Sequence, residues 1–235
     1  MGGDCQCFFA VEICYLIYMD TETLLKNTSR RLYLSVQALP KNMRPAFGIA
    51  YLLCRYADTI ADTPLIAPAR RLDWIGQFPA LLEEQNQTQI SRLTQEIEGG
   101  SENPYEAELI RRLAPCLQAL NRIRPHQRAC IMEVVRAVCE GMKTDLRTFP
   151  PENAGEIKAF ACAEDLMHYC RLMGGKPGLF WSKLIYQLTP VPMPEQDFYE
   201  LGQHIGDALQ IVNILRDLPK DLRIGRCYFP AQDLA

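Results

Sequence analysis

The sequence predicts an all-α protein. From Asp20 onward apolar residues recur at helical spacing, no segment alternates as a half-buried strand does, and Pro and Gly separate the helical stretches. The chain has 235 residues, of which 48% are hydrophobic and 23% charged, as in ordinary soluble globular proteins. No change of composition divides the chain, so we expect one helical domain over residues 20–235.

The first 19 residues form a separate extension. Its apolar run at residues 8–19 is preceded by Asp4 and interrupted by Glu12. A signal peptide carries basic residues before its apolar run, and a helix needs about 20 apolar residues to span a bilayer. The extension is therefore expected to dock on the core or to lie on a surface, unless Met19 is the true start.

The helices follow in order. Steps of seven, four and three between apolar residues predict a first helix that ends near Leu39 and Pro40. Pro45 suits the first turn of a second helix, which runs to Asp62 and should be buried because it is apolar on almost every face. Further helices are expected at about 68–85, 103–120, 126–145, 160–185 and 195–218, with loops at 99–104 and 149–153.

Charge and cysteine content argue against several classes of function. With 25 Lys and Arg against 28 Asp and Glu, the net charge of −3 does not favour nucleic-acid binding. The ten cysteines are spread through apolar helical stretches, which is typical of reduced thiols in the cytoplasm rather than of a disulfide scaffold. Cys5 and Cys7 have no second ligand pair, so no zinc site is expected.

A polar stripe crosses the second helix. Tyr51, Arg55, Asp58 and Asp62 are separated by four, three and four residues and so share one face. Burying two carboxylates and a guanidinium is costly unless they have partners. The stripe therefore lines a polar cavity or faces another helix; the alternative is a structural ion pair between Arg55 and Asp58.

The last expected helix repeats this pattern. Gly206, Gln210, Asn213 and Asp217 share one face, and Arg216 lies beside them. If the two stripes face each other across a bundle, carboxylates gather at one end of a pocket with hydrocarbon below. Carboxylates at close quarters need cations, and their oxygens suit Mg²⁺, which commonly bridges to phosphate. The pattern predicts a diphosphate on a hydrocarbon tail as ligand.

Other residues near the stripes fit the same ligand. Arginine forks can bind phosphate oxygens in a bidentate way, although any one arginine is more often an ion-pair residue. Glycines inside a helix cost about 1 kcal/mol each relative to alanine, so the cluster at 174–178 predicts that a prenyl chain approaches the backbone. Close helix packing at a kink beside Pro177 is the alternative. The arginines concerned are Arg30, Arg55, Arg216 and Arg226.

Taken together, these stretches resemble the squalene/phytoene synthases, the head-to-head prenyl synthases. The order and spacing of the motifs match from about residue 22 to the end, and such a set is far more specific than a lone DxxxD. The similar stretches are residues 28–30 and 34–36, 51–62, 169–183, 210–217 and 226–230.

The resemblance implies a fold and a set of site residues. The fold is an isoprenoid-synthase-type helical bundle with a central prenyl-diphosphate pocket. Implied ligands of Mg²⁺ are Asp58, Asp62, Asp217 and Asp221. Implied catalytic residues near the reacting carbons are Tyr51, Arg55 and Tyr169. Implied substrate-binding residues are Ser29, Arg30, Arg55, Gly174, Gly178, Gln210, Asn213, Arg216 and Arg226.

It also implies a reaction. One prenyl diphosphate ionises, the cation attacks the double bond of a second, and a cyclopropyl diphosphate forms. Squalene synthases then reduce this intermediate with NADPH, whereas phytoene-type enzymes lose a proton. Residues 145–150 and 178–183 are most similar to bacterial squalene synthases, which favours farnesyl diphosphate as substrate. The alternatives are a phytoene- or dehydrosqualene-type synthase and a non-catalytic binding or assembly protein. Peripheral membrane association would help a cytoplasmic enzyme to release a hydrocarbon product.

The sequence departs from the family pattern at three places. Lys176 and Pro177 stand in the family's V-A-G-x-V-G segment, and Lys220 stands where an acidic residue is common. Pro219 is expected to break the helix between Asp217 and Asp221, which form the second aspartate motif; Asp58 and Asp62 form the first. The chain also ends fourteen residues after Asp221, whereas the family continues through several more helices that close the pocket, so the domain is expected to lack these C-terminal helices.

Overall fold

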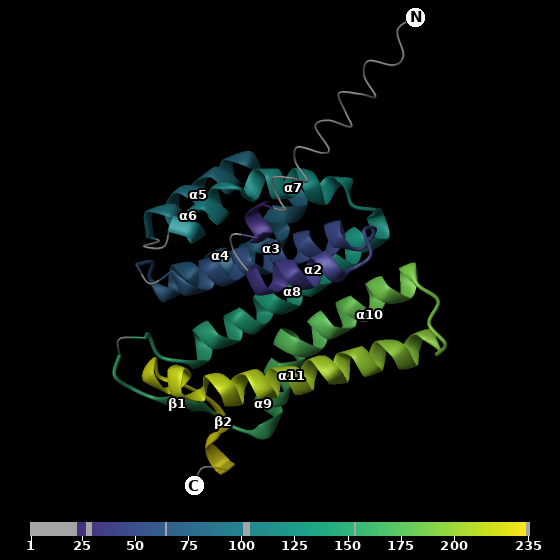
Figure 1. Ribbon diagram of the computed structural model, residues 1–235. Coiled ribbons are helices and arrows are strands. Elements are labelled where there is room, and N and C mark those ends of the chain that lie inside the picture. The colour runs from purple at the N-terminus through teal and green to yellow at the C-terminus, as the bar shows by residue number, and fades with distance from the viewer. Residues whose placement is uncertain (1–22, 27–29, 64, 101–103, 153, 234–235) are drawn as a thin grey trace, which may run out of the picture.

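The computed structural model describes residues 23–26, 30–63, 65–100, 104–152 and 154–233. Within these ranges the protein is a bundle of helices with one pair of short strands, so the all-α prediction is confirmed (Figure 1). Residues 1–19, for which we predicted an apolar extension, lie outside the described residues, as does Ser29.

The helices in chain order are α2 (Arg30–Ala38), α3 (Arg44–Asp62), α4 (Pro68–Glu84), α5 (Gln87–Gly100), α6 (Pro104–Arg111), α7 (Leu113–Arg122), α8 (Pro125–Thr148), α9 (Ala163–Cys170), the π-helical segment η1 (Arg171–Gly175), α10 (Lys176–Leu188) and α11 (Glu195–Arg223). The strands are β1 (Lys158–Phe160) and β2 (Arg226–Pro230), and a 3₁₀ turn, η2 (Ala231–Asp233), follows β2. Most long helices match the expected ranges.

Prolines mark the starts of the longest central helices. Pro45, Pro68 and Pro125 lie in the first turns of α3, α4 and α8. A proline costs little there because the first backbone N–H groups of a helix have no intrahelical acceptor. These positions explain why the starts of the three helices could be predicted closely.

The region between α4 and α8 differs from our expectation. Helix α5 was not predicted and it includes residues 99 and 100, which we expected in a loop. Its apolar face is narrow, with Ile90, Leu93 and Ile97 buried on an otherwise polar segment. The single helix expected at 103–120 is divided into α6 and α7. Pro115, which has no N–H to donate to the carbonyl four residues earlier, accounts for the break.

No strand was expected, and the structure contains two. Strand β1 pairs with β2 in parallel, with Lys158 opposite Arg226 and Ala159 opposite Cys227. The strands contain three and five residues, which is too short for a recognisable alternation. Their pairing brings β2 beside α9, so that Phe160, Tyr169 and Tyr228 belong to one aromatic cluster.

Pro219 does not end α11, contrary to our prediction. The helix continues through it to Arg223, since a single proline removes only one backbone hydrogen bond and the last turn carries basic residues that suit a helix C-terminus. Gly225, at φ 83°, then turns the chain into β2. The two aspartates of the second motif therefore remain one helical turn apart on α11.

Helix α8 runs through the centre of the molecule. It packs against α3 and α4 on one side and against α10 and η1 on the other, while α11 packs on α10 and η1 (Figure 1). The helices α5, α6 and α7 lie on the far side of α3 and α4 from α11 (Figure 1). Among the described residues, no helix is long and apolar enough to cross a membrane.

Helix α11 leaves one apolar face uncovered. Large apolar side chains recur along it at helical spacing with about half of their surface exposed: Leu201 44%, Ile205 52%, Leu209 59%, Val212 57% and Leu215 54%. By contrast, α3 has eleven buried residues. The two helices that carry the aspartate motifs thus have very different surroundings.

Candidate active site

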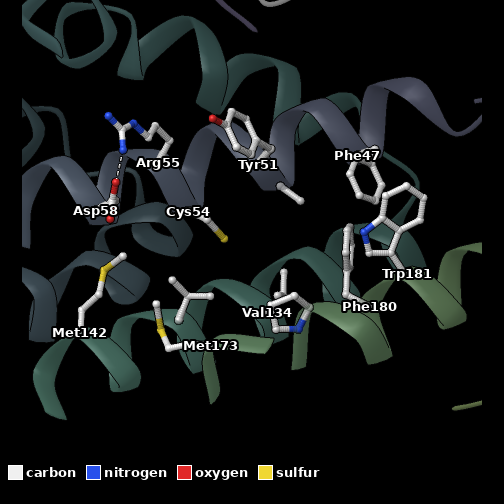
Figure 2. Close-up of a pocket in the computed structure, with 13 residues that line it drawn as sticks. Phe47, Tyr51, Cys54, Arg55, Asp58, Val134, Met142, Met173, Phe180 and Trp181 are labelled. Carbon is white, nitrogen blue, oxygen red and sulfur yellow. Dashed lines mark hydrogen bonds and ion pairs between the residues drawn. The ribbon is translucent and has the colours of Figure 1, made fainter. Parts of the chain in front are cut away.

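Three of the predicted site residues, Tyr51, Arg55 and Asp58, line a cavity of about 370 Å³ between α3, α8 and α10 (Figure 2). Its polar end holds Arg55 and Asp58, and its other end holds Phe47 and Trp181. The lining residues are Phe47, Ala50, Tyr51, Cys54, Arg55, Asp58, Val134, Val138, Met142, Met173, Pro177, Phe180 and Trp181. A cavity with an ionic end and a long apolar wall suits an amphiphilic ligand.

Aromatic rings close the apolar end. The ring centroid of Phe47 lies 3.7 Å from that of Trp181 and 5.7 Å from that of Phe180. Such packing holds the rings in fixed positions. The pKa of Cys54, on the same wall, is raised to about 12 by burial, so this thiol is neutral and adds to the apolar surface.

Arg55 and Asp58 form an ion pair, which the sequence analysis gave as the alternative to a polar cavity. Arg55 donates from Nη1 to Oδ2 of Asp58 within one turn of α3. Each side chain keeps 35% of its surface exposed and faces the cavity (Figure 2). The ion pair is therefore not buried in the core. Arg55 and Asp58 both form an ion pair and line a polar part of the cavity, so the two alternatives hold together.

A smaller cavity of about 150 Å³ continues from the polar end. It shares Asp58, Met142 and Met173 with the first cavity and adds Asp62. Its other polar lining residues are Asp145, Tyr169, Arg226 and Tyr228. Helices α3, α8 and α9 and strand β2 thus meet here, and the first aspartate motif lies opposite four polar residues from later parts of the chain.

Asp145 is at the centre of a buried hydrogen-bond network in this smaller cavity. The hydroxyls of Tyr169 and Tyr228 each donate to its Oδ2 at 3.1 Å. The two tyrosine rings are stacked with centroids 4.8 Å apart. Burial raises the pKa of Asp145 to about 7, although Arg226 and the two hydroxyls act in the opposite direction.

Arg226 is held between carboxylates. Its Nη1 lies 3.6 Å from Oδ2 of Asp145 and its Nη2 lies 3.4 Å from Oε1 of Glu152. Burial alone would lower its pKa, but attraction to Asp145, Tyr228 and Asp62 raises it. Only 16% of the side chain is exposed, so this positive charge is fixed at the cavity.

The second stripe lies at a third cavity, of about 480 Å³, between η1, α10 and α11. Gln210 and Asn213 line it, and Asn213 donates from Nδ2 to Oε1 of Gln210 at 3.4 Å. Met173, Pro177 and Trp181 line both this cavity and the first. The two stripes therefore lie at neighbouring cavities rather than opposite each other in one.

The two aspartates of the second motif differ from each other. Arg216 binds Asp217 with two hydrogen bonds of 2.9 and 2.6 Å, which lowers the pKa of Asp217. This pair is exposed, with 65% of the Arg216 side chain and 43% of the Asp217 side chain accessible. Burial raises the pKa of Asp221, and the nearby Arg226 opposes this shift.

The four motif aspartates are not gathered into one cluster. Within the part of the chain that the structure describes, no group of three or more His, Cys, Asp or Glu side chains is placed to hold a metal ion. The assignment of Asp58, Asp62, Asp217 and Asp221 to Mg²⁺ therefore stays a prediction.

The glycines serve close helix packing. A Cβ on Gly174 would overlap the backbone oxygen of Gly206, and one on Gly178 would overlap that of Gly202. Helix α11 thus approaches η1 and α10 at the backbone, as in the packing alternative of the sequence analysis, and the approach of a ligand to these glycines stays a prediction. Both Gly174 and Gly178 nevertheless line the third cavity.

Two predicted site residues have no described side chain, and two residues that line the smaller cavity had no predicted role. Ser29 lies outside the described residues, and Arg30 begins α2 with a side chain that is not described. Asp145 and Tyr228 were assigned no role. A signal for Asp145 exists in the sequence, because it lies three residues after Met142 on the face of α8 that buries Val134 and Val138.

A model of the squalene/phytoene synthase family matches residues 25–235. The chain belongs to this family. It is 23% identical over 211 residues to squalene synthase ERG9 of Candida albicans and 24% identical over 223 residues to the bifunctional lycopene cyclase/phytoene synthase of Leptosphaeria maculans. A bifunctional lycopene cyclase/phytoene synthase of Fusarium fujikuroi is 29% identical over 213 residues.

A solved structure has the same fold. TcSQS in complex with the ligand BPH1237 superposes with a TM-score of 0.71 at 21% identity and covers 91% of this chain. The chain spans only part of each of these proteins: 44% of the Candida albicans enzyme, 35% of the Leptosphaeria maculans enzyme, 32% of the Fusarium fujikuroi enzyme and 58% of the TcSQS chain.

Proposed function

We propose that this protein is a prenyltransferase that condenses two farnesyl diphosphates head to head, through presqualene diphosphate, to squalene. The observation that carries this proposal is the cavity that runs from Arg55 and Asp58 to Phe47 and Trp181 in a chain of the squalene/phytoene synthase family. An ionic end and an apolar wall are what a prenyl diphosphate requires.

The apolar walls would bind the hydrocarbon chains and exclude water from a carbocation. Two neighbouring cavities share the wall formed by Met173, Pro177 and Trp181, which gives room for two prenyl chains side by side. Tyr51 lines the first cavity between its ionic and aromatic ends. Its ring face could stabilise positive charge on carbon close to the departing diphosphate.

The polar end fits a magnesium diphosphate. Asp58 and Asp62 lie one turn apart at the smaller cavity, and both offer carboxylate oxygens there. Oxygen donors of this kind suit a hard cation. Bound Mg²⁺ would neutralise the diphosphate and assist its departure. Asp217 and Asp221 would join it from α11, which requires Asp217 to leave Arg216.

Arginines would bind the leaving diphosphate. Arg226 lies at the smaller cavity with its charge fixed by Asp145 and Glu152, and Arg55 lies at the polar end of the first cavity. Phosphate oxygens accept paired hydrogen bonds from guanidinium groups. Ser29, Arg30, Gln210, Asn213 and Arg216 remain proposed contributors to the same binding.

A phytoene-type synthase is the second candidate. The relatives include bifunctional phytoene synthases at identities no lower than those of the squalene synthases, which favours keeping it. The two candidates differ in chain length and in the last step, since only squalene formation consumes NADPH.

We also propose a cytoplasmic location with peripheral membrane contact. None of the seven described cysteines forms a disulfide, which supports a reducing compartment. Vesicle sedimentation tests the membrane contact.

The deciding experiment incubates the purified protein with Mg²⁺ and farnesyl or geranylgeranyl diphosphate, with and without NADPH. We expect diphosphate release, squalene with NADPH and presqualene diphosphate without it. Preference for geranylgeranyl diphosphate would support the phytoene type, and tight binding without release would support a binding protein. Folded protein that neither binds nor turns over either substrate would contradict the proposal.

A further inference from the structure

Asp145 occupies a position in the site that neither aspartate motif explains. It lies near the end of α8, across the smaller cavity from Asp58 and Asp62. Only 12% of its side chain is exposed. Burying a carboxylate costs free energy unless other groups pair with it. The groups that contact Asp145 therefore indicate its role.

Three donors converge on one oxygen of this carboxylate. Oδ2 of Asp145 accepts the hydroxyls of Tyr169 and Tyr228 and lies 3.6 Å from Nη1 of Arg226. The donors come from α9 and β2, which are 24 and more than 80 residues away along the chain. Asp145 thus joins three separate segments at the cavity wall.

This arrangement determines what the tyrosines present to the cavity. A tyrosine hydroxyl has one proton, and when that proton is donated to Asp145 the oxygen can only accept further hydrogen bonds. Both tyrosines line the cavity beside Asp58 and Asp62. The two hydroxyl oxygens lie 3.4 Å apart, and Tyr228 also interacts with Arg226. The shared carboxylate and the stacked rings therefore fix the positions of both hydroxyls at the cavity wall.

Arg226 is oriented by the same carboxylate. It lies between Asp145 and Glu152 and is attracted by Asp62 across the cavity. If Asp145 were replaced by an uncharged residue of the same shape, the Arg226 guanidinium would lose its buried carboxylate partner. Its remaining partner, Glu152, is 35% exposed, and an ion pair with an exposed carboxylate is weak. The direction of Arg226 toward the first motif then depends on Asp145.

We propose that Asp145 is a positioning residue of the prenyl-diphosphate site, which holds the Tyr169 and Tyr228 hydroxyls in place at the cavity wall and directs Arg226 toward the first aspartate motif. The inference rests on the proposed function. Asp145 does not touch substrate in this role; it acts through Tyr169 and Arg226. A purely structural role in the Phe149, Phe160 and Tyr228 cluster is the alternative that the experiment must separate.

The test compares steady-state kinetics on farnesyl diphosphate with Mg²⁺ for Asp145→Asn, Tyr169→Phe and the double variant. We expect Asp145→Asn to lower kcat at least tenfold while KM changes less than about threefold. Because Asp145 acts partly through the Tyr169 hydroxyl, the two losses should overlap, and kcat of the double variant should fall by clearly less than the product of the two single losses. Glu140→Gln, an exposed carboxylate on the same helix paired with Lys143, is the matched control.

Tyr228→Phe keeps the proposal testable if Asp145→Asn does not fold. It removes one donor and leaves the Tyr169 bond, so a smaller loss of kcat, about threefold, is expected at unchanged KM. Wild-type kcat in both Asp145→Asn and Tyr228→Phe, or losses that multiply fully in the double variant, would overturn the positioning role alone. A folded wild-type protein without turnover would overturn the proposed function and this inference together.

Discussion

The two aspartate motifs have the same spacing in the sequence and different surroundings in the structure. Asp58 and Asp62 lie on α3, which packs against α2, α4, α6, α7 and α8, and both line a cavity with Asp145 and Arg226. Asp217 lies on α11, whose outer face is exposed, and it is bound by Arg216. Spacing alone therefore predicts which residues share a helix face, while the packing of that helix decides whether the face forms a site.

Both motifs contain an ion pair, but Arg55 and Asp58 pair at the wall of a cavity, whereas Arg216 and Asp217 pair on an exposed part of α11. Arg216 has to release Asp217 before that carboxylate can take a cation. An exposed salt bridge is worth only about 0 to 1 kcal/mol, so the release is inexpensive. The comparison can be tested by substitutions placed on each helix.

The largest expected effect is on core packing. Leu53 on α3 is fully buried, whereas Leu209 on α11 is 59% exposed. Leu53→Ala should lower the free energy of unfolding by about 2 to 5 kcal/mol because it leaves a cavity, and Leu209→Ala should change it by less than about 0.5 kcal/mol. Urea unfolding measures both. Equal losses would mean that the α11 face is covered in solution and would break the comparison.

The second largest effect concerns the dependence of stability on pH. Burial raises the pKa of Asp145 to about 7 in the folded protein from an ordinary value of 3.8. The folded state then holds a proton that the unfolded state has lost, so stability falls as pH rises from about 4 to 7. Between pH 5 and pH 8 the titration of this carboxyl should lower the free energy of unfolding by roughly 2 to 3 kcal/mol.

Unfolding of wild type and Asp145→Asn at the two pH values tests this expectation, because all other groups contribute to both proteins. The asparagine variant should lose most of the pH dependence in this window. Arg216 lowers the pKa of Asp217, so the contribution of Asp217 to stability is lost as the pH falls. Asp217→Asn should therefore remove a part of the pH dependence that has the opposite sign and is confined to acid pH. The same pH dependence in wild type and Asp145→Asn would show that Asp145 is not buried as described.

The smallest effect concerns the contact of α11 with η1. A Cβ on Gly206 would overlap the backbone oxygen of Gly174, whereas one on Gly76 in α4 meets no atom within 4 Å. Gly206→Ala should destabilise by about 1 to 3 kcal/mol, while Gly76→Ala should stabilise by up to about 1 kcal/mol. Thermal unfolding distinguishes them. A stabilising Gly206→Ala would mean that α11 does not approach η1 at the backbone.

Most of the fold could be predicted from the helical periodicity of apolar residues. The wide apolar faces of α3 and α8 and the prolines at their starts made both helices predictable. Helix α5 was missed because only three positions on it are buried, and the strands were missed because their pairing is a long-range contact between short segments. Helix α11 was expected to break at Pro219 because a proline rule overstates the loss of a single backbone hydrogen bond near a helix end.

The site was predictable where it lies on one helix. The face shared by Tyr51, Arg55 and Asp58 follows from spacing alone, and the structure places all three at one cavity. Tyr228 and Arg226 reach Asp145 only through the turn after α11 and the pairing of β1 with β2. No local pattern connects residues so far apart in the chain.

The central claim is that the α3 end of the site binds a magnesium diphosphate before the α11 end is arranged. Calorimetric titration with farnesyl thiodiphosphate, a slowly ionising analogue, tests it with and without Mg²⁺. The account predicts Mg²⁺-dependent binding that weakens at least tenfold, or about 1.4 kcal/mol, in Asp58→Asn, less in Asp217→Asn and not at all in Glu140→Gln. Binding that is equal in wild type and Asp58→Asn, or independent of Mg²⁺, would contradict it.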